Sequence, residues 1–165
     1  PTEGDLGNGV DADGCPIPDT VETGRFVSFI NNLPDGTTVR VVNTVDSTET
    51  TVNITGDGTV TIENLPVGTY DIFAQAPQHL SAVASSIMIV ANEDYVAGPV
   101  TLLNGDVDND GTIGNLDAIV VNGGYNFDVP PAPAEADLIK DGKIDIFDVT
   151  VIGVNYGEVA PTNWQ

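Results

Sequence analysis

The chain has 165 residues and is strongly acidic: 25 residues are Asp or Glu and 4 are Lys or Arg, which gives a formal net charge of -21. Because phosphate groups are bound through Lys and Arg, this balance argues against nucleic acid and anionic membranes as partners. No run of 18 apolar residues could cross a membrane, and a hydrophobic share of 41% is typical of a globular protein with one ordinary domain or two small ones. Self-repulsion at this charge favours divalent cations as ligands.

Residues 1–22 are rich in Gly, Asp and Pro and have no hydrophobic periodicity, so we expect an extended arm or linker. This segment holds the only cysteine, Cys15, in an Asp-rich setting that is unlike the surroundings of a reactive thiolate. We interpret Cys15 as an unpaired thiol, with an intermolecular disulfide as the alternative. No leader peptide is visible, and in a secreted protein it would already have been removed.

Residues 23–103 are predicted to form an antiparallel β-sandwich. Short segments rich in Val, Ile and Thr are bounded by turn residues at 25–30, 37–45, 50–55, 58–64, 68–76, 85–90 and 96–103. Asp57-Gly58 predicts a tight hairpin between the third and fourth segments, because Gly accepts a positive φ and Asp bonds its own backbone. That hairpin would place four side chains on one face: Val52, Ile54, Val60 and Ile62. The triplet that begins at Asn53 permits N-glycosylation.

The run around this turn resembles the carboxypeptidase regulatory-like family. Its pattern, D-G-x-[FV]-x-[IL]-x-N-[LV]-P-x-G-x-Y, is matched by Asp57, Gly58, Val60, Ile62, Asn64, Leu65, Pro66, Gly68 and Tyr70. The resemblance implies an immunoglobulin-like or transthyretin-like sandwich that serves as a non-catalytic spacer or binding platform.

From residue 104 the chain repeats a loop followed by an apolar segment, with an offset of 31 residues. Asp106, Asp110, Gly111, Ile113, Asp117, Val120 and Tyr125 correspond to Asp137, Asp141, Gly142, Ile144, Asp148, Val151 and Tyr156. The Pro- and Ala-rich connector at 127–136 is unsuited to helix or strand, and it should set the two copies side by side. We therefore expect a small α module at 104–160 and a tail at 161–165.

The first copy has the ligand spacing of a calcium loop. Calcium takes six to eight oxygens, which a loop supplies from positions 1, 3, 5, 7 and 12, with a glycine at position 6 for the sharp turn. The glycine is Gly111, and a water near Gly114 would complete the shell. The predicted ligands are Asp106, Asp108, Asp110, the Thr112 carbonyl and Asp117. A solvated acidic turn, the alternative, does not explain the fixed offsets of Gly111 and Ile113.

The second copy departs from this pattern at position 3, where Ile139 offers no oxygen, and it contains Lys140 and Lys143. We expect a second calcium ion here, with Asp145 at position 9 coordinating directly in compensation; a weaker or empty site is the alternative. The predicted ligands are Asp137, Asp141, the Lys143 carbonyl, Asp145 and Asp148.

Position 12 is Asp in both copies, and no amphipathic helix precedes either loop, so each unit is a loop followed by a helix. The duplicated units resemble type I dockerins, EF-hand-like modules that attach secreted bacterial proteins to cohesin receptors. The resemblance implies structural calcium and a binding face on the helices. The chain lacks the basic pair usual in that family, and its residues at positions 10 and 11 are the candidate partner contacts: Asn115, Leu116, Ile146 and Phe147. Packing on the sandwich is the alternative role for Ile146 and Phe147.

We expect no enzyme, since the only histidine, His79, has no nucleophile motif near it. The sequence predicts a secreted, extracellular assembly protein whose partner is a cohesin-like receptor, or other copies of itself in a fibre or sheath joined by the N-terminal arm. The alternative is a carbohydrate-binding or spacer sandwich with a dockerin plug, from a cellulosome-like polysaccharide-degrading protein. Trp164 would then be a sugar contact rather than a packing plug.

Overall fold

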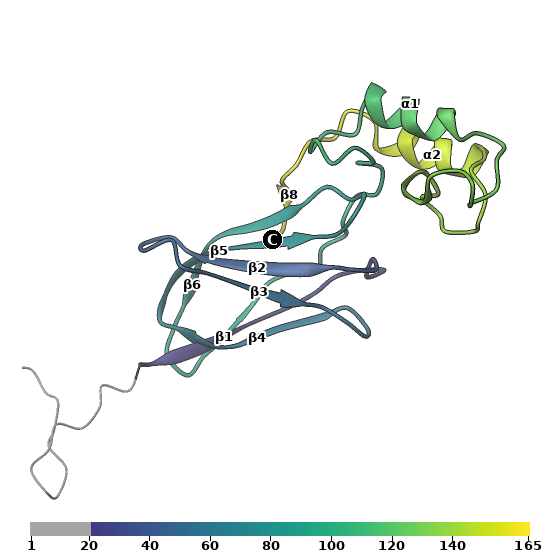
Figure 1. Cartoon of the computed structure of the whole chain (residues 1–165). Coiled ribbons are helices and arrows are strands. Elements are labelled where there is room, and N and C mark those ends of the chain that lie inside the picture. Colours follow the sequence, from purple (N-terminus) through teal and green to yellow (C-terminus); the bar gives the residue numbers. More distant parts are fainter. Residues whose placement is uncertain (1–20) are drawn as a thin grey trace, which may run out of the picture.

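The computed structural model describes residues 21–165, so the expected arm, apart from its last two residues, and Cys15 lie outside the described part. Two units follow one another along the chain, a β-sandwich and a smaller unit with two helices at one end of it (Figure 1). Within residues 21–165, neither helix is long and apolar enough to span a membrane.

The sandwich consists of two sheets. One has the strand order β4-β1-β7, and the other has the order β3-β2-β5-β6-β8. Neighbouring strands are antiparallel, as expected, except that β7 and β8 are parallel to β1 and β6. The strands are β1 (Thr23–Phe29), β2 (Thr38–Asn43), β3 (Glu49–Asn53), β4 (Thr59–Pro66), β5 (Gly68–Gln75), β6 (Ala82–Ile89), β7 (Asp94–Val96) and β8 (Thr162–Asn163).

The core of the sandwich follows from the alternation of side chains along its strands. In β5 every second residue is buried, and β2 and β4 show the same period of two over most of their length. The buried faces of the two sheets meet in a single cluster that includes Phe26, Val39, Val60, Ile72 and Ile89. Burial of this apolar surface is the main favourable contribution to the sandwich's stability.

The predicted hairpin at Asp57-Gly58 is wrong. β3 pairs with β2, and β4 pairs with β1, so the chain crosses from one sheet to the other at this turn. The turn chemistry itself is present, since the Asp57 carboxylate accepts a hydrogen bond from the Thr59 amide at 2.9 Å. Turn residues set the local bend, whereas the choice of partner strand depends on the rest of the fold. The four side chains assigned to one face do contact one core, but from opposite sheets.

Gly58 should be more sensitive to substitution than Gly56. Both have positive φ, +95° and +89°, but a methyl group at Gly58 would overlap the Ile30 carbonyl oxygen, whereas nothing lies within 4 Å at Gly56. We expect Gly56→Ala to cost about 1 kcal/mol through backbone strain. Gly58→Ala should cost at least about twice as much, measured as the free energy of unfolding in urea. Equal losses for the two variants would contradict the close approach of the Ile30 backbone.

The second unit, the helical unit, contains α1 (Asn115–Gly123) and α2 (Ile146–Asn155), which pack against each other. The connector between them is irregular apart from one 3-10 turn, Ala134–Ala136. The unit has a small core of its own, to which the sandwich contributes Leu80 from the loop between β5 and β6. The buried members are Leu80, Val107, Ile113, Val121, Ala136, Leu138, Ile144 and Ile152.

The repeat seen in the sequence is also a repeat in hydrogen bonding. The Ile113 amide donates to the Glu158 carbonyl, and the equivalent Ile144 amide donates to the Phe127 carbonyl, both at 3.0 Å. In return, the Gly157 amide donates to the Ile113 carbonyl, and the Asn126 amide donates to the Ile144 carbonyl. These two donors are also 31 residues apart. Each loop therefore pairs with the segment that follows the helix of the other copy, and neither copy is complete by itself.

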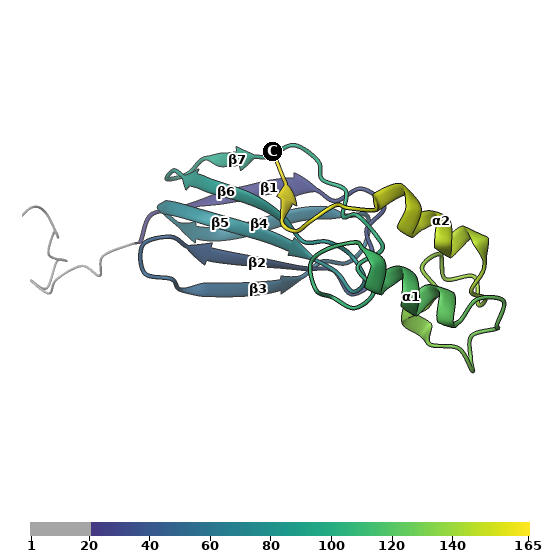
Figure 2. The ribbon, with the colours of Figure 1, turned by 90° about the horizontal axis from the view of Figure 1, so that it is seen from above.

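The last residues belong to the sandwich and are not a separate tail. β8 lies beside β6, so the chain returns from the helical unit to the sheet (Figure 2). The Trp164 side chain is 3% exposed, and its indole N–H lies 3.0 Å from both the Ser28 hydroxyl and the Gly98 carbonyl. Its ring meets Phe26 edge to face, with the centroids 5.5 Å apart. Trp164 is therefore a packing plug and not a sugar contact.

Candidate metal centre

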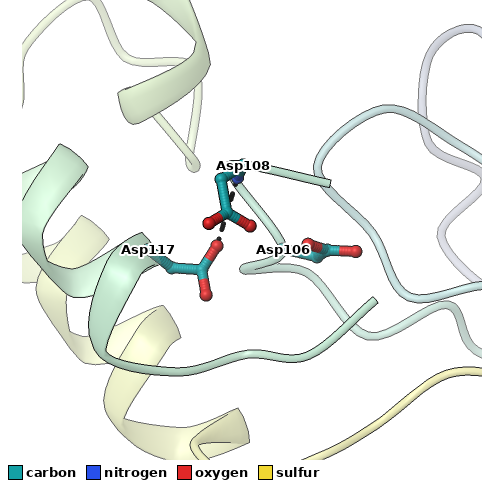
Figure 3. A group of neighbouring side chains, drawn as sticks. All are labelled: Asp106, Asp108 and Asp117. Carbon is teal, nitrogen blue, oxygen red and sulfur yellow. Dashed lines mark hydrogen bonds between the residues drawn. The ribbon is translucent and has the colours of Figure 1, made fainter. Parts of the chain in front are cut away.

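Loop 1, residues 106–117, brings three of its predicted ligands together (Figure 3). Asp106, Asp108 and Asp117 each place a carboxylate oxygen within 4.8 Å of the others. Asp106 and Asp117 are 4% and 1% exposed, while Asp108 is open to solvent. Negative charges this close repel one another, and burial removes the water that would screen them, so the group is suited to a bound cation.

Asp117 fixes the geometry of loop 1 from the first turn of α1. One of its oxygens accepts hydrogen bonds from the amides of Val107 and Asp108, at 2.6 and 3.2 Å. The other oxygen accepts a bond from the Gly114 amide at 2.7 Å. These bonds tie the start of the loop to the start of the helix.

Asp106 has a buried oxygen without a partner. Its Oδ2 accepts a hydrogen bond from the Gly111 amide at 3.1 Å, but Oδ1 has no hydrogen-bond partner. Burial raises the pKa of Asp106, and the charges of Asp117, Asp110 and Asp108 raise it further, against the lowering effect of the Gly111 amide. A desolvated carboxylate oxygen without a partner is costly, and a divalent cation would supply the missing interaction. The donor set is all oxygen, which fits calcium.

The remaining predicted ligands of loop 1 are not part of the group of three. Asp110 accepts a hydrogen bond from the Thr112 amide at 2.8 Å, and the Asp110 amide donates to Asp108 Oδ1 at 3.1 Å. Both are side-chain turns that curl the loop around its centre. Coordination by Asp110 and by the Thr112 carbonyl stays a prediction.

Loop 2, residues 137–148, repeats the hydrogen bonds between the loop and its helix, but it does not bring three carboxylates together. Asp148 accepts from the amides of Leu138, Ile139 and Asp145, at 2.7, 3.2 and 2.9 Å, as Asp117 does in loop 1. Asp137 differs, because both of its oxygens are occupied, by the amides of Asp141 at 3.2 Å and Gly142 at 2.9 Å. Within residues 21–165, the only group of three close carboxylates is the one in loop 1.

Asp145, expected to compensate for Ile139, also has a structural role. It is the N-cap of α2, and its carboxylate accepts a hydrogen bond from the Phe147 amide at 2.9 Å. Asp141 accepts from the Lys143 amide at 3.0 Å, the counterpart of the Asp110 turn. These two carboxylates each accept one backbone hydrogen bond, and coordination by Asp141, Asp145 and the Lys143 carbonyl stays a prediction.

The candidate partner contacts lie at the starts of the two helices. Leu116 and Phe147 occupy equivalent positions and are 57% and 61% exposed, and Ile146 is exposed as well, so these residues do not pack on the sandwich. The Asn115 side chain accepts a hydrogen bond from the Tyr156 hydroxyl at 2.7 Å. Sequence reasoning missed the further exposed apolar residues Ile119 and Val154, which lie three and seven positions after Leu116 and Phe147. Helical spacing could have found them.

The other side chains considered for chemistry are used structurally. His79 is half-buried, and its Nδ1 donates to the Pro77 carbonyl at 2.6 Å, while burial lowers the pKa of the ring. On the outer face of the larger sheet, the Arg40 guanidinium lies 4.4 Å from the centroid of the Phe73 ring and covers it. Asn53 is exposed at the end of β3, so the glycosylation triplet is accessible at its acceptor residue.

No protein-family model matches the chain, and no curated protein sequence matches it. The solved structures that resemble it include two type II cohesin-X-dockerin complexes from Acetivibrio cellulolyticus that carry interface mutations. The complex mutated at the C-terminal interface has a TM-score of 0.63 and 19% identity, and the one mutated at the N-terminal interface has 0.64 and 15%. Each match covers 83% of this chain and 97% of the other chain.

At these identities the likeness concerns the fold. It supports a mainly β, sandwich-like architecture with two helices, of the kind found in cohesin-dockerin assemblies. The covered share is larger than the sandwich alone, so the similarity extends into the helical unit. Neither the carboxypeptidase regulatory-like resemblance nor the dockerin resemblance has a match among the family models.

Proposed function

We propose that this chain is a non-catalytic, extracellular docking protein whose helical unit is ordered by calcium and binds a partner of the cohesin kind. The observation that carries the calcium part is the group of Asp106, Asp108 and Asp117, with the buried, unpartnered Oδ1 of Asp106. An ion held there would join the first residues of loop 1 to the first turn of α1. Its role would be to order the chain and not to react with a substrate.

The docking part rests on the exposed apolar residues of the helices. We name Leu116, Ile119, Ile146, Phe147 and Val154 the exposed helix residues. Buried hydrophobic anchors contribute most of the energy of protein interfaces, and the high negative charge of the rest of the chain keeps it soluble while these residues stay uncovered. Likeness to chains of cohesin-X-dockerin complexes supports a protein partner of the cohesin-dockerin kind, and we take a cohesin as the partner because the exposed apolar residues lie on the helices.

Binding to a type II cohesin tests this proposal. We expect calorimetric titration in calcium to show a complex, and Leu116→Asp combined with Phe147→Asp to weaken it at least about 30-fold, the effect of losing a central apolar anchor. Met88→Asp on the sandwich, also an exposed apolar position, is the matched control and should bind as the wild type does. Unchanged affinity of the double variant would contradict the assignment of this surface.

Self-assembly and sugar binding are the competing outcomes. A fibre joined by residues 1–22 remains a prediction, because residues 1–20 lie outside the described part. Size-exclusion chromatography in calcium and in chelator distinguishes docking from self-assembly, since the docking proposal expects a monomer in calcium. The carbohydrate alternative expects retention on cellulose or chitin, whereas burial of Trp164 and covering of Phe73 by Arg40 favour the protein partner.

A further inference from the structure

We propose that the helical unit binds a single calcium ion, in loop 1, and that loop 2 is closed by a backbone hydrogen bond in place of a second ion. The inference rests on the proposed function only in taking calcium as the ligand. It concerns the number of sites, which the repeat in the sequence would set at two.

The two loops differ at one oxygen atom. In loop 1 the Asp110 amide donates to Asp108 Oδ1 at 3.1 Å, and Asp106 Oδ1 is left buried and without a partner. In loop 2 the residue equivalent to Asp108 is Ile139, which has no oxygen to accept this bond. The Asp141 amide donates instead to Asp137 Oδ1, at 3.2 Å. The carboxylate oxygen that has no partner in loop 1, Asp106 Oδ1, therefore corresponds to an oxygen in loop 2, Asp137 Oδ1, that already accepts a hydrogen bond.

The presence of Ile139 in place of an aspartate at position 3 has two consequences for an ion in loop 2. The substitution removes one carboxylate ligand, and the redirected amide occupies an oxygen of a second one. Calcium needs six to eight oxygens, and its affinity depends on the number and charge of the ligands. Both loops contain four Asp, but only loop 2 also contains lysines, Lys140 and Lys143, which lower its negative field.

Loop 2 keeps its shape without the ion because its framework is made of hydrogen bonds. Asp148 is fully buried and holds three amides, and Asp145 caps α2. Four carboxylate–amide contacts thus join the loop to its helix. Hydrogen bonds to charged groups contribute about 1.5–3 kcal/mol each, so this set is sufficient to close a short loop.

Counting the bound ions tests the inference. We expect titration of the full chain with calcium chloride to give one ion per chain, and Ile139→Asp to give two. Ile139 is partly exposed, so the variant should fold, and circular dichroism checks that it does. The matched variant Asp108→Ile gives loop 1 the sequence feature of loop 2 and should remove the ion.

The outcomes are distinct. Two ions in the wild type would overturn the single-site inference, and one ion in a folded Ile139→Asp variant would overturn the role given to Ile139 in closing loop 2; both would leave the docking proposal intact. No ion in the wild type would instead contradict calcium binding itself. Amide spectra give a second readout: the Gly111 signal should shift on addition of calcium, while those of Asp141 and Gly142 should stay in place.

Discussion

Removal of calcium is expected to unfold the helical unit while the sandwich stays folded. The helical unit has a small core, and loop 1 places three carboxylates close together with two of them buried, so their repulsion opposes folding once the ion has left. The sandwich has a larger core of its own. An ion present at a thousand times its dissociation constant stabilises the folded state by about 4 kcal/mol, which is comparable to the whole stability of a small unit.

Circular dichroism at 222 nm, in calcium and in chelator, measures this effect. We expect the helical signal to be lost in chelator and restored by excess calcium, and amide exchange to become fast in residues 104–160 but not in β1 to β6. Asp106→Asn should weaken calcium binding by at least about tenfold, since it removes one negative charge from the ligand set. Asp137→Asn is the matched control in loop 2 and should leave calcium affinity unchanged. A helical signal that is insensitive to chelator would contradict the role given to the ion.

The sequence predicted those parts of the site that depend on local spacing. Position 12 of each loop is an aspartate that holds the amides of its own loop, and both helices begin just before that aspartate, as expected for a loop followed by a helix. The offset of 31 residues likewise predicted that loop and helix repeat, but not the hydrogen bonds that join one copy to the other. The bonds within one loop can be anticipated from a sequence because the residues that interact are close together along the chain.

Other features depend on residues that are distant in the chain and could not be predicted in this way. The Asp57-Gly58 turn bends the chain as its residues require, but whether β4 pairs with β3 or with β1 is decided by the packing of the two sheets. The return of the chain through β8, only two residues long, has no hydrophobic period to reveal it. The hydrogen bond from the Asp141 amide to Asp137 could not be predicted either. The sequence shows that Ile139 has no oxygen to accept this bond, but it does not show which other oxygen accepts it.

Trp164→Ala is expected to destabilise the sandwich by about 3–5 kcal/mol, the usual cost of removing a large aromatic side chain from a core. The indole is buried against Phe26, and its N–H lies within hydrogen-bonding distance of Ser28 and Gly98. Trp164→Phe separates the contribution of ring packing from that of the indole hydrogen bonds. It keeps an aromatic ring beside Phe26 but leaves the Ser28 and Gly98 acceptors without the indole donor, so it should cost about 1–3 kcal/mol. Urea unfolding in saturating calcium measures both losses.

The Trp164→Ala substitution should also weaken calcium binding, although Trp164 is not one of the predicted ligands. The segment before β8 pairs with loop 1, since the Ala160 amide donates to the Gly111 carbonyl and the Gly157 amide to the Ile113 carbonyl, both at 2.8 Å. Anchoring of Trp164 in the sandwich therefore holds residues 157–160 against loop 1. If the anchor is lost, ordering of residues 157–160 must be driven by calcium binding, which lowers the observed affinity. We expect a severalfold higher dissociation constant for Trp164→Ala and little change for Trp164→Phe. Equal calcium affinities of Trp164→Ala and the wild type would show that the sandwich and the metal loop fold independently.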